Sequence, residues 1–297
     1  MNTGEYVLIT PARNEAAHIE QLLNSVLQQT ILPKKWVVVS DASTDETDSI
    51  VRKYAQKYSL ISYVRREADT GRNFASKVYA VQHGWKHLQD DGYEFIGVVD
   101  CDVVVDTDFV ERLLAHFMQD PQLGVAGGWK YEQKGGTLVP RGINRKWAVT
   151  GAFQMFRRAC FEAIGGFIPL EWGGEDTVAC VMARMCGWRV EAFSELPIRH
   201  VRSTGFASGS VLKTRIREGR MDHAIGYHFL YELLKCVRRL SEFPFFIGSC
   251  LSFMGYCYYL LQRAPILVPP EVVNYMKKEQ MATLKTAFSR ARRGILE

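Results

Sequence analysis

The sequence lacks the cysteine patterns of a disulfide-rich or zinc-binding protein. Its seven cysteines are an odd number, and no two of them have the Cys-x-x-Cys spacing. Residues 1–6 have neither a basic start nor an apolar core, so we expect no secretory signal. A reduced, cytoplasmic setting therefore fits this chain better than an oxidising one.

Internal repeats and low-complexity segments are also absent, and apolar residues make up 47% of the 297 residues against 23% charged, which is typical of a globular protein. The net charge of +5 is unevenly divided. Residues 1–200 carry 22 Lys and Arg against 25 Asp and Glu, whereas residues 201–297 carry 15 against 7. A basic C-terminal third fits an anionic membrane face. With no basic-aromatic ladder in the sequence, we expect no nucleic-acid partner.

Short apolar runs alternate with helical patterns in the first hundred residues. The apolar runs predict buried strands at 6–10, 36–39, 60–64 and 95–99. Helices are expected between them, over 14–29, from Asp45 to about residue 58, and over 74–88. The alternation predicts a doubly wound, mostly parallel α/β sheet with helices on both faces.

The pattern becomes mixed after residue 121. We expect further strands at 123–129, 152–156 and 188–193, helices at 157–164 and 175–186, and a glycine-rich loop at 132–146. The chain beyond residue 208 has helical patterns around an apolar stretch. We therefore divide it into an α/β domain at 1–207 and a helical, membrane-associating region at 208–297.

Polar clusters follow the predicted strands, at the edge where open α/β sheets bind ligands. Asp100-Cys101-Asp102 follows the strand at 95–99. Two carboxylates at this spacing suit Mn²⁺ or Mg²⁺, which also bind phosphate oxygens. A solvated turn with helix-capping acids is the alternative. His200 follows the last strand-like segment, where it is either a further metal ligand or a structural histidine.

Residues after the first two strands are candidates for nucleotide binding. Asp41 is placed to accept a hydrogen bond from a base N–H, whereas Asp45 is equally well explained as a helix cap. The loop after the first strand offers backbone groups that would line a base, and its candidate residues are Pro11, Ala12, Arg13 and Glu15.

A basic segment precedes and begins the helix expected at 74–88. Arg72 follows Gly71, and we expect its guanidinium to hold the phosphates of the nucleotide. Runs of charge usually form solvated surface, and we assign that role to the other members, Arg65, Arg66 and Lys77.

The segment Gly173-Gly174-Glu175-Asp176 precedes another predicted helix. Glycines allow close backbone approach, and carboxylates at a helix N-terminus are favoured in their ionised form. An ionised carboxylate can act as general base for an acceptor hydroxyl. Asp176, with Glu175 beside it, is therefore the candidate catalytic residue, and ordinary helix capping is the alternative. Trp172 either stacks on the acceptor or packs within the fold.

Taken in order, four motifs resemble those of the family 2 glycosyltransferases over residues 6–202: Thr10-Pro-Ala-Arg-Asn-Glu15, Ser40-Asp-Ala-Ser-Thr-Asp45, Asp100-Cys-Asp102 and Gly174-Glu-Asp176. The resemblance implies the GT-A fold and an inverting transferase with a nucleoside-diphosphate sugar donor, UDP or GDP being expected, and a glycan or lipid-linked acceptor. It implies nucleotide contacts at Pro11, Glu15 and Asp41, with Asp100 near the donor. It also implies a metal on Asp102 and His200, and a base at Asp176.

Some residues depart from the family pattern. Cys101 stands where a small residue is common, and the loop usually rich in Asn and Gly reads Asp69-Thr-Gly-Arg-Asn73. The chain has no Gln-x-x-Arg-Trp motif, which argues against a processive synthase of the cellulose or chitin type. The C-terminal third resembles a subgroup tied to polysaccharide assembly.

Two other functions compete with sugar transfer. A sugar-phosphate nucleotidyltransferase would need a glycine-rich, basic signature after the first strand, which residues 10–14 lack. A non-catalytic nucleotide-sugar-binding protein would have no need of both the Asp100/Asp102 pair and Asp176.

Residues 243–262 form a stretch of 20 residues without charge, about the length that spans a bilayer. Its proline and glycines, and the tyrosines gathered at one end, argue against a span, which would also leave a basic flank on the far side. We expect an interfacial or re-entrant segment that docks on the cytoplasmic face of the membrane. A buried core helix and a true span are the alternatives.

Overall fold

The computed structural model describes residues 4–67, 73–89, 92–134, 137–140, 144–201 and 211–294. The candidate Arg72 and most of the segment 69–73 lie outside these ranges. The chain divides into two compact units, the first made of residues 1–171 and 175–203, and the second of residues 172–174 and 204–297. The functional division at residue 207 stays a prediction.

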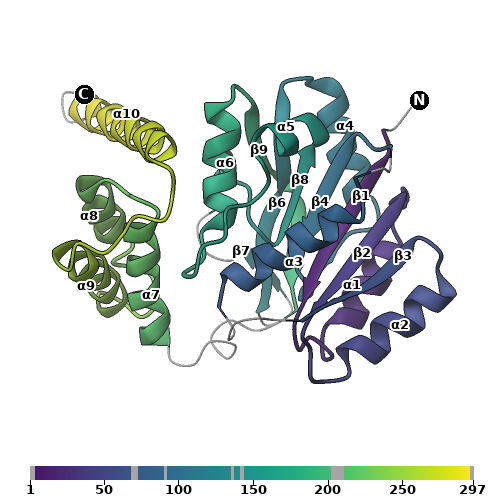
Figure 1. Ribbon diagram of the computed structural model, residues 1–297. Helices are drawn as coiled ribbons and strands as arrows, with labels where there is room; N and C mark the ends of the chain where they lie inside the picture. The colour runs from purple at the N-terminus through teal and green to yellow at the C-terminus, as the bar shows by residue number, and fades with distance from the viewer. Residues whose placement is uncertain are drawn as a thin grey trace. The chain divides into compact units, whose positions relative to one another are not determined.

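Among the described residues, the first unit contains a nine-stranded sheet in the order β3-β2-β1-β4-β8-β6-β9-β5, with β7 beside β6 (Figure 1). Its first half is parallel: β1 (Tyr6–Ala12) lies between β2 (Lys35–Asp41) and β4 (Phe95–Val99), and β3 (Ile61–Arg66) pairs with β2. The predicted parallel α/β core is confirmed.

The second half of the sheet is mixed. The strand β8 (Phe153–Arg157) is antiparallel to both β4 and β6 (Leu123–Lys134). The long strand β9 (Arg189–His200) is parallel to β6, and the short strand β5 (Val103–Val105) is antiparallel to β9. This arrangement puts the residues just before β5 next to the last residues of β9.

Side chains on the two faces of the sheet fill two separate cores. In β1, Tyr6 and Leu8 belong to one core, and Val7 and Ile9 belong to the other. One face is covered by α1 (Ile19–Leu27), α2 (Thr47–Lys57) and α4 (Phe109–Gln119). The other is covered by α3 (Ala75–Lys86), α5 (Arg158–Ala163) and α6 (Glu175–Met185). The uninterrupted apolar runs of β1 and β2 reflect this double coverage.

Three details of the second half differ from the sequence prediction. The segment 132–146, expected as a loop, contains a hairpin in which β7 (Thr137–Pro140) pairs with the end of β6. The strand β9 continues seven residues beyond the expected end at residue 193, and β5 was not expected at all. These strands are polar or very short, so their partners define them rather than an apolar run. Gly128 is required at a bulge in β6, since a Cβ there would lie 1.9 Å from the carbonyl oxygen of Leu196.

The second unit contains four helices among its described residues: α7 (Val211–Ala224), α8 (Phe229–Arg238), α9 (Ile247–Leu261) and α10 (Pro270–Gly294), drawn green to yellow in Figure 1. Helices α7 and α9 approach closely through glycine, since a Cβ on Gly219 would lie 1.8 Å from the carbonyl oxygen of Ser252. None of the described helices has the length and hydropathy needed to cross a membrane. The segment 243–262 is a four-residue connection followed by α9.

A buried ionic cluster joins α7 to α8. The ammonium of Lys235 contacts the carboxylates of Asp222 and Glu232, the latter at 2.7 Å. Both carboxylates belong to buried residues. Burial raises the pKa of Asp222 to about 7, since the charged form loses its hydration.

Candidate active site

A hydrogen bond links the end of β1 to the turn that follows β4. Pro11 and Ala12 are the last residues of β1, and the carbonyl oxygen of Pro11 accepts a weak hydrogen bond from the Cys101 thiol at 3.3 Å. Cys101 lies between the two aspartates that follow β4 and is buried. Its thiol thus links the Asp100–Asp102 turn to the loop proposed to line the nucleotide base.

Asp41, at the end of β2, is buried and bound by two guanidinium groups. One carboxylate oxygen lies 3.3 Å from Nη1 of Arg13, and the other contacts Arg66. The structure therefore brings the candidates Arg13 and Asp41 together. It also corrects the assignment of Arg66 to solvated surface, because a buried carboxylate needs such a partner.

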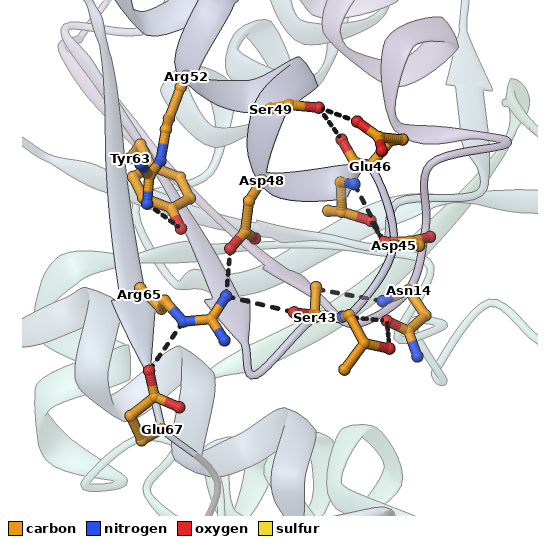
Figure 2. Close-up of polar contacts among 12 residues, drawn as sticks. Asn14, Ser43, Asp45, Glu46, Asp48, Ser49, Arg52, Tyr63, Arg65 and Glu67 are labelled. Carbon is orange, nitrogen blue, oxygen red and sulfur yellow. Dashed lines mark hydrogen bonds and ion pairs between the residues drawn. The ribbon is translucent and has the colours of Figure 1, made fainter.

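The loops after β1 and β2 are joined by hydrogen bonds, several of which Figure 2 shows. The backbone N–H of Thr44 donates to Oδ1 of Asn14 at 2.8 Å, and the N–H of Asn14 donates to Oγ of Ser43 at 3.2 Å. Asn14 has a φ of 55°, a region that asparagine tolerates better than most residues. The N–H of Glu15 donates to Oγ1 of Thr47 at 2.8 Å, so this candidate lies where the two loops meet.

Asp45 also joins these two loops. Its carboxylate accepts hydrogen bonds from the N–H groups of Ala16 and Thr47, each at 3.0 Å. Burial acts to raise its pKa, but these bonds, with that from the Thr47 hydroxyl, outweigh it and lower the pKa. Thr47 is the first residue of α2, so Asp45 ties the start of this helix to the loop after β1, and the geometry favours a structural role for it.

Arg65 also makes polar contacts within the protein (Figure 2). It contacts Asp48, donates to the carbonyl oxygen of Ser43 at 3.3 Å and lies 2.8 Å from Glu67. These contacts hold the edge of β3 against the loop after β2. We assign Arg65 a structural role.

Asp102 and His200 meet through the pairing of β5 with β9. Val103 lies opposite His200 in this pair, and the N–H of Val201 donates to the carbonyl oxygen of Asp102 at 2.8 Å. Nδ1 of His200 lies 3.7 Å from Oδ1 of Asp102. Both ring nitrogens of His200 are buried and have no hydrogen-bond partner in the part of the chain that the structure describes. Such nitrogens fit a metal ligand, which needs one of them free for the cation.

The acids and histidines of the described ranges form no cluster of three or more that would hold a metal ion by themselves. A divalent cation of the Mg²⁺ type needs fewer protein ligands when a bound phosphate supplies the rest. Asp102 and His200 therefore fit a cation that takes its remaining ligands from a bound phosphate.

Lys77 is the functional candidate that the sequence interpretation missed. Its ammonium lies 2.7 Å from Oδ1 of Asp100 at the end of β4, and 3.4 Å from Oε1 of Glu175 at the start of α6. It also donates to the carbonyl oxygen of Gly151 at 3.4 Å. Burial disfavours the ammonium, but the charges of Asp100 and Glu175 outweigh burial and raise the pKa of Lys77. The prediction that Lys77 forms solvated surface was wrong.

A signal for Lys77 was present in the sequence. It stands on the same helical stripe as Ala80, Val81 and Gly84, which are all buried. A lysine on a buried stripe of α3 needs carboxylate partners. These came from segments 23 and 98 residues further along, which periodicity cannot identify.

Burial also acts on the two carboxylates that Lys77 contacts. It raises the pKa of Asp100, opposed by the charge of Lys77 and assisted by that of Asp102. It raises the pKa of Glu175 as well, again opposed by Lys77 and assisted by Asp176. The three groups form one ionic cluster at the strand ends, with the ammonium as the shared counter-charge.

Asp176 lies at the start of α6, beside this cluster. One carboxylate oxygen accepts a hydrogen bond from the N–H of Gly151 at 2.8 Å, and the other from the N–H of Thr177 at 2.7 Å. The same Gly151 accepts from Lys77. The candidate base is thus oriented by two backbone donors, next to the residues that follow β4.

Trp172 belongs to the second unit, where the guanidinium carbon of Arg220 lies 3.1 Å from its ring centroid. Arg220 lies also over the ring of Tyr259, at 4.2 Å. Both contacts are of the cation–π type. Within its own unit, Trp172 therefore has a packing role.

The model of the family described as glycosyl transferase family 2 matches residues 7–178. This chain belongs to that family. The matched segment includes the Asp100–Asp102 motif and Asp176, whereas His200 lies beyond it. The predicted family is confirmed.

Two curated relatives are poly-beta-1,6-N-acetyl-D-glucosamine synthases. That of Staphylococcus aureus (strain COL) is 28% identical over 252 residues, which cover 79% of this chain and 57% of the relative. That of Staphylococcus epidermidis is 27% identical over 170 residues, covering 51% of this chain and 39% of the relative. This family 2 chain therefore spans only 39% to 57% of the length of these relatives.

Solved glycosyltransferase structures show the same GT-A fold. A mannosyltransferase from Pyrobaculum calidifontis, in complex with GDP-Man and Mn²⁺, has a TM-score of 0.56 and 20% identity over 97% of this chain and 80% of its own. GalNAc-T7 with UDP, GalNAc and Mn²⁺ has a TM-score of 0.59 and 15% identity over 89% and 58%. S. aureus TarS with UDP-GlcNAc has a TM-score of 0.53 and 18% identity over 92% and 78%. The predicted fold class is confirmed.

Proposed function

We propose that this family 2 glycosyltransferase moves a sugar from a nucleoside-diphosphate sugar to an acceptor hydroxyl, with inversion at the anomeric carbon, in polysaccharide or glycolipid assembly. The observation that carries the proposal is the bridge made by Lys77. Its ammonium lies 2.7 Å from Asp100 and 3.4 Å from Glu175. The bridge joins the Asp100–Asp102 motif to the helix start that carries Asp176.

The donor nucleotide would lie across the ends of β1 and β2. Asp41, at the end of β2, would accept from the base, and its present partner Arg13 lies on the loop proposed to line that base. UDP and GDP are the nucleotides to test first, because solved structures of the same fold contain UDP-GlcNAc, UDP or GDP-Man. The curated relatives make UDP-GlcNAc the first sugar to try.

Asp102 and His200 would hold Mn²⁺ or Mg²⁺. The ring nitrogens of His200, which have no hydrogen-bond partner among the described residues and of which Nδ1 lies 3.7 Å from Oδ1 of Asp102, support this assignment. Two of the similar structures contain Mn²⁺. When bound there with the donor, the cation would neutralise negative charge on the leaving diphosphate.

Asp176 would act as general base. Its carboxylate accepts the proton of the acceptor hydroxyl while that oxygen bonds to the anomeric carbon. The bond from that carbon to the diphosphate breaks on the opposite side, and its electron pair leaves with the nucleoside diphosphate. One such displacement inverts the anomeric centre. The bonds from Gly151 and Thr177 hold the carboxylate in one orientation throughout.

A thermal-shift screen tests the donor part of the proposal. UDP-, GDP- and dTDP-sugars are each added with and without Mn²⁺. A donor at 100 times its Kd stabilises the native state by about 2.7 kcal/mol. We expect a rise in Tm for one nucleotide, larger with Mn²⁺.

Two variants make the screen specific. The metal-dependent part of the rise should be lost in Asp102→Asn and kept in Asp106→Asn, a nearby acid that pairs with Arg199 instead. No shift with any nucleotide sugar, or equal shifts in both variants, would contradict the proposed donor site.

A further inference from the structure

An exposed apolar segment joins α8 to α9 in the second unit. Its side chains Phe243, Phe245, Phe246 and Ile247 are 70%, 59%, 65% and 58% exposed. We call these four residues the apolar tip. Single exposed apolar residues are common on soluble proteins, whereas a contiguous group marks an interaction surface.

Hydrogen bonds fix the backbone of the apolar tip. The carbonyl oxygen of Phe243 accepts a hydrogen bond from Nη2 of Arg215 at 2.8 Å. The N–H of Gly248 closes a turn on the carbonyl oxygen of Pro244 at 2.8 Å. Phe246 has a φ of 54°, a conformation uncommon for an aromatic residue and typical of functional segments. The side chains are therefore exposed in a defined conformation.

The acidic residues beside the tip are neutralised. Glu242 lies 2.8 Å from Nε of Arg239, and Glu218 lies 3.0 Å from Nη1 of Arg215. The same two arginines make the cross contacts, Arg239 to Glu218 at 3.2 Å and Arg215 to Glu242 at 3.6 Å. This four-residue ionic cluster carries no net charge and forms the base of the tip.

Exposed positive charge lies at the same end of the unit. Arg238 is exposed at the end of α8, five residues before Phe243. Lys213 is exposed on the first turn of α7, the helix whose Arg215 contacts the tip. Beside it, Leu212 and Ile216 are 44% and 42% exposed, which extends the apolar surface.

We infer that the apolar tip docks this unit on an anionic lipid bilayer. Aromatic side chains would enter the headgroup boundary while Arg238 and Lys213 meet acidic lipid headgroups. Protruding aromatic residues flanked by exposed positive charge suit a bilayer surface of opposite charge. Docking of this kind does not require a helix to cross the bilayer. Helix α9 has 15 residues and is about 22 Å long, which is shorter than the hydrocarbon core of about 30 Å. The inference does not depend on the proposed sugar transfer.

Flotation with vesicles tests the inference directly. The full chain is mixed at low salt with vesicles of phosphatidylcholine alone, or of phosphatidylcholine and phosphatidylglycerol in equal parts. We expect binding to the mixed vesicles only. Phe245→Ser/Phe246→Ser should lower the partition coefficient about ten-fold or more, because two aromatic side chains no longer enter the bilayer. Arg238→Ala and Lys213→Ala should each lower it about five-fold.

A matched control separates the tip from general stickiness. Leu32→Ser/Met118→Ser removes two side chains of similar exposure, 46% and 52%, from the first unit, and should leave vesicle binding unchanged. An unchanged circular dichroism spectrum and a cooperative thermal unfolding transition confirm that the tip variant folds. Failure of the wild-type chain to float with anionic vesicles would overturn the inference. So would equal binding by the tip variant, or loss of a dimer as the sole effect of the substitutions.

Discussion

Replacing Lys77 by methionine is the sharpest test of the ionic cluster at the strand ends. Methionine keeps most of the side-chain length and removes only the ammonium, which lies 2.7 Å from Asp100 and 3.4 Å from Glu175. The substitution leaves both carboxylates without their shared counter-charge. We expect a less stable protein and the loss of sugar transfer.

The size of the stability loss follows from burial. Removing one partner of a buried ion pair costs about 3–5 kcal/mol. The Lys77 side chain is 23% exposed, so water screens part of the interaction and the lower end, about 3 kcal/mol, applies. At about 2–4 °C per kcal/mol for a domain of this size, Tm should fall by about 6–12 °C.

A double-mutant cycle measures whether the loss arises from the cluster. Glu175→Gln removes one of the two negative charges, so Lys77→Met should cost less in that background, with a coupling free energy of about 0.5–3 kcal/mol. Lys77→Arg keeps the charge and should recover part of the transfer rate. Lys86→Met, at the exposed end of the same helix, is the matched control. A change in Tm no larger than that of the control, or zero coupling, would show that Lys77 does not stabilise the two carboxylates.

Three further predictions concern other parts of the chain. Asp102→Ala should abolish metal-dependent transfer with the fold intact, and transfer that survives both EDTA and this substitution would contradict the metal assignment. Gly151→Ala places a Cβ 3.1 Å from Oδ2 of Asp176, so the shifted carboxylate should slow transfer about ten-fold while the donor thermal shift stays unchanged. Burial raises the pKa of Asp222 to about 7, so its contribution to stability is full below about pH 4 and is lost as the pH rises to about 7. Asp222→Asn should flatten this part of the Tm–pH profile, and an unchanged profile would contradict it.

The parallel half of the fold was predictable because its physical signal is local. Val37, Val38 and Val39 are buried on both faces of the sheet, so the strand appears in the sequence as an uninterrupted apolar run. The β6–β7 hairpin and β5 have no such run. Polar residues such as Glu132 and Gln133 become strand residues only because Val139 and Leu138 lie opposite them.

The parts of the candidate site that a single short segment of sequence identifies were predictable. Acids after β4 and at the start of α6 stand out in the sequence, and the structure puts Asp100 and Glu175 on one ammonium. The carboxylate partners of that ammonium were not predictable, because the contacts depend on three segments that meet only in the fold. Arg66 is a similar case, since its contact with Asp41 depends on the pairing of β2 with β3.

We propose that this chain transfers sugar from a nucleotide donor with Asp176 as the base. The most direct measurement compares the wild type with Asp176→Asn in the release of nucleoside diphosphate and in the anomeric configuration of the product, with the donor found by thermal shift, Mn²⁺ and an acceptor. We expect an inverted product from the wild type. In Asp176→Asn we expect transfer to be slower by about 10²-fold or more, with the donor thermal shift unchanged. Near-native turnover in that variant, or a product that retains the configuration of the donor, would contradict it.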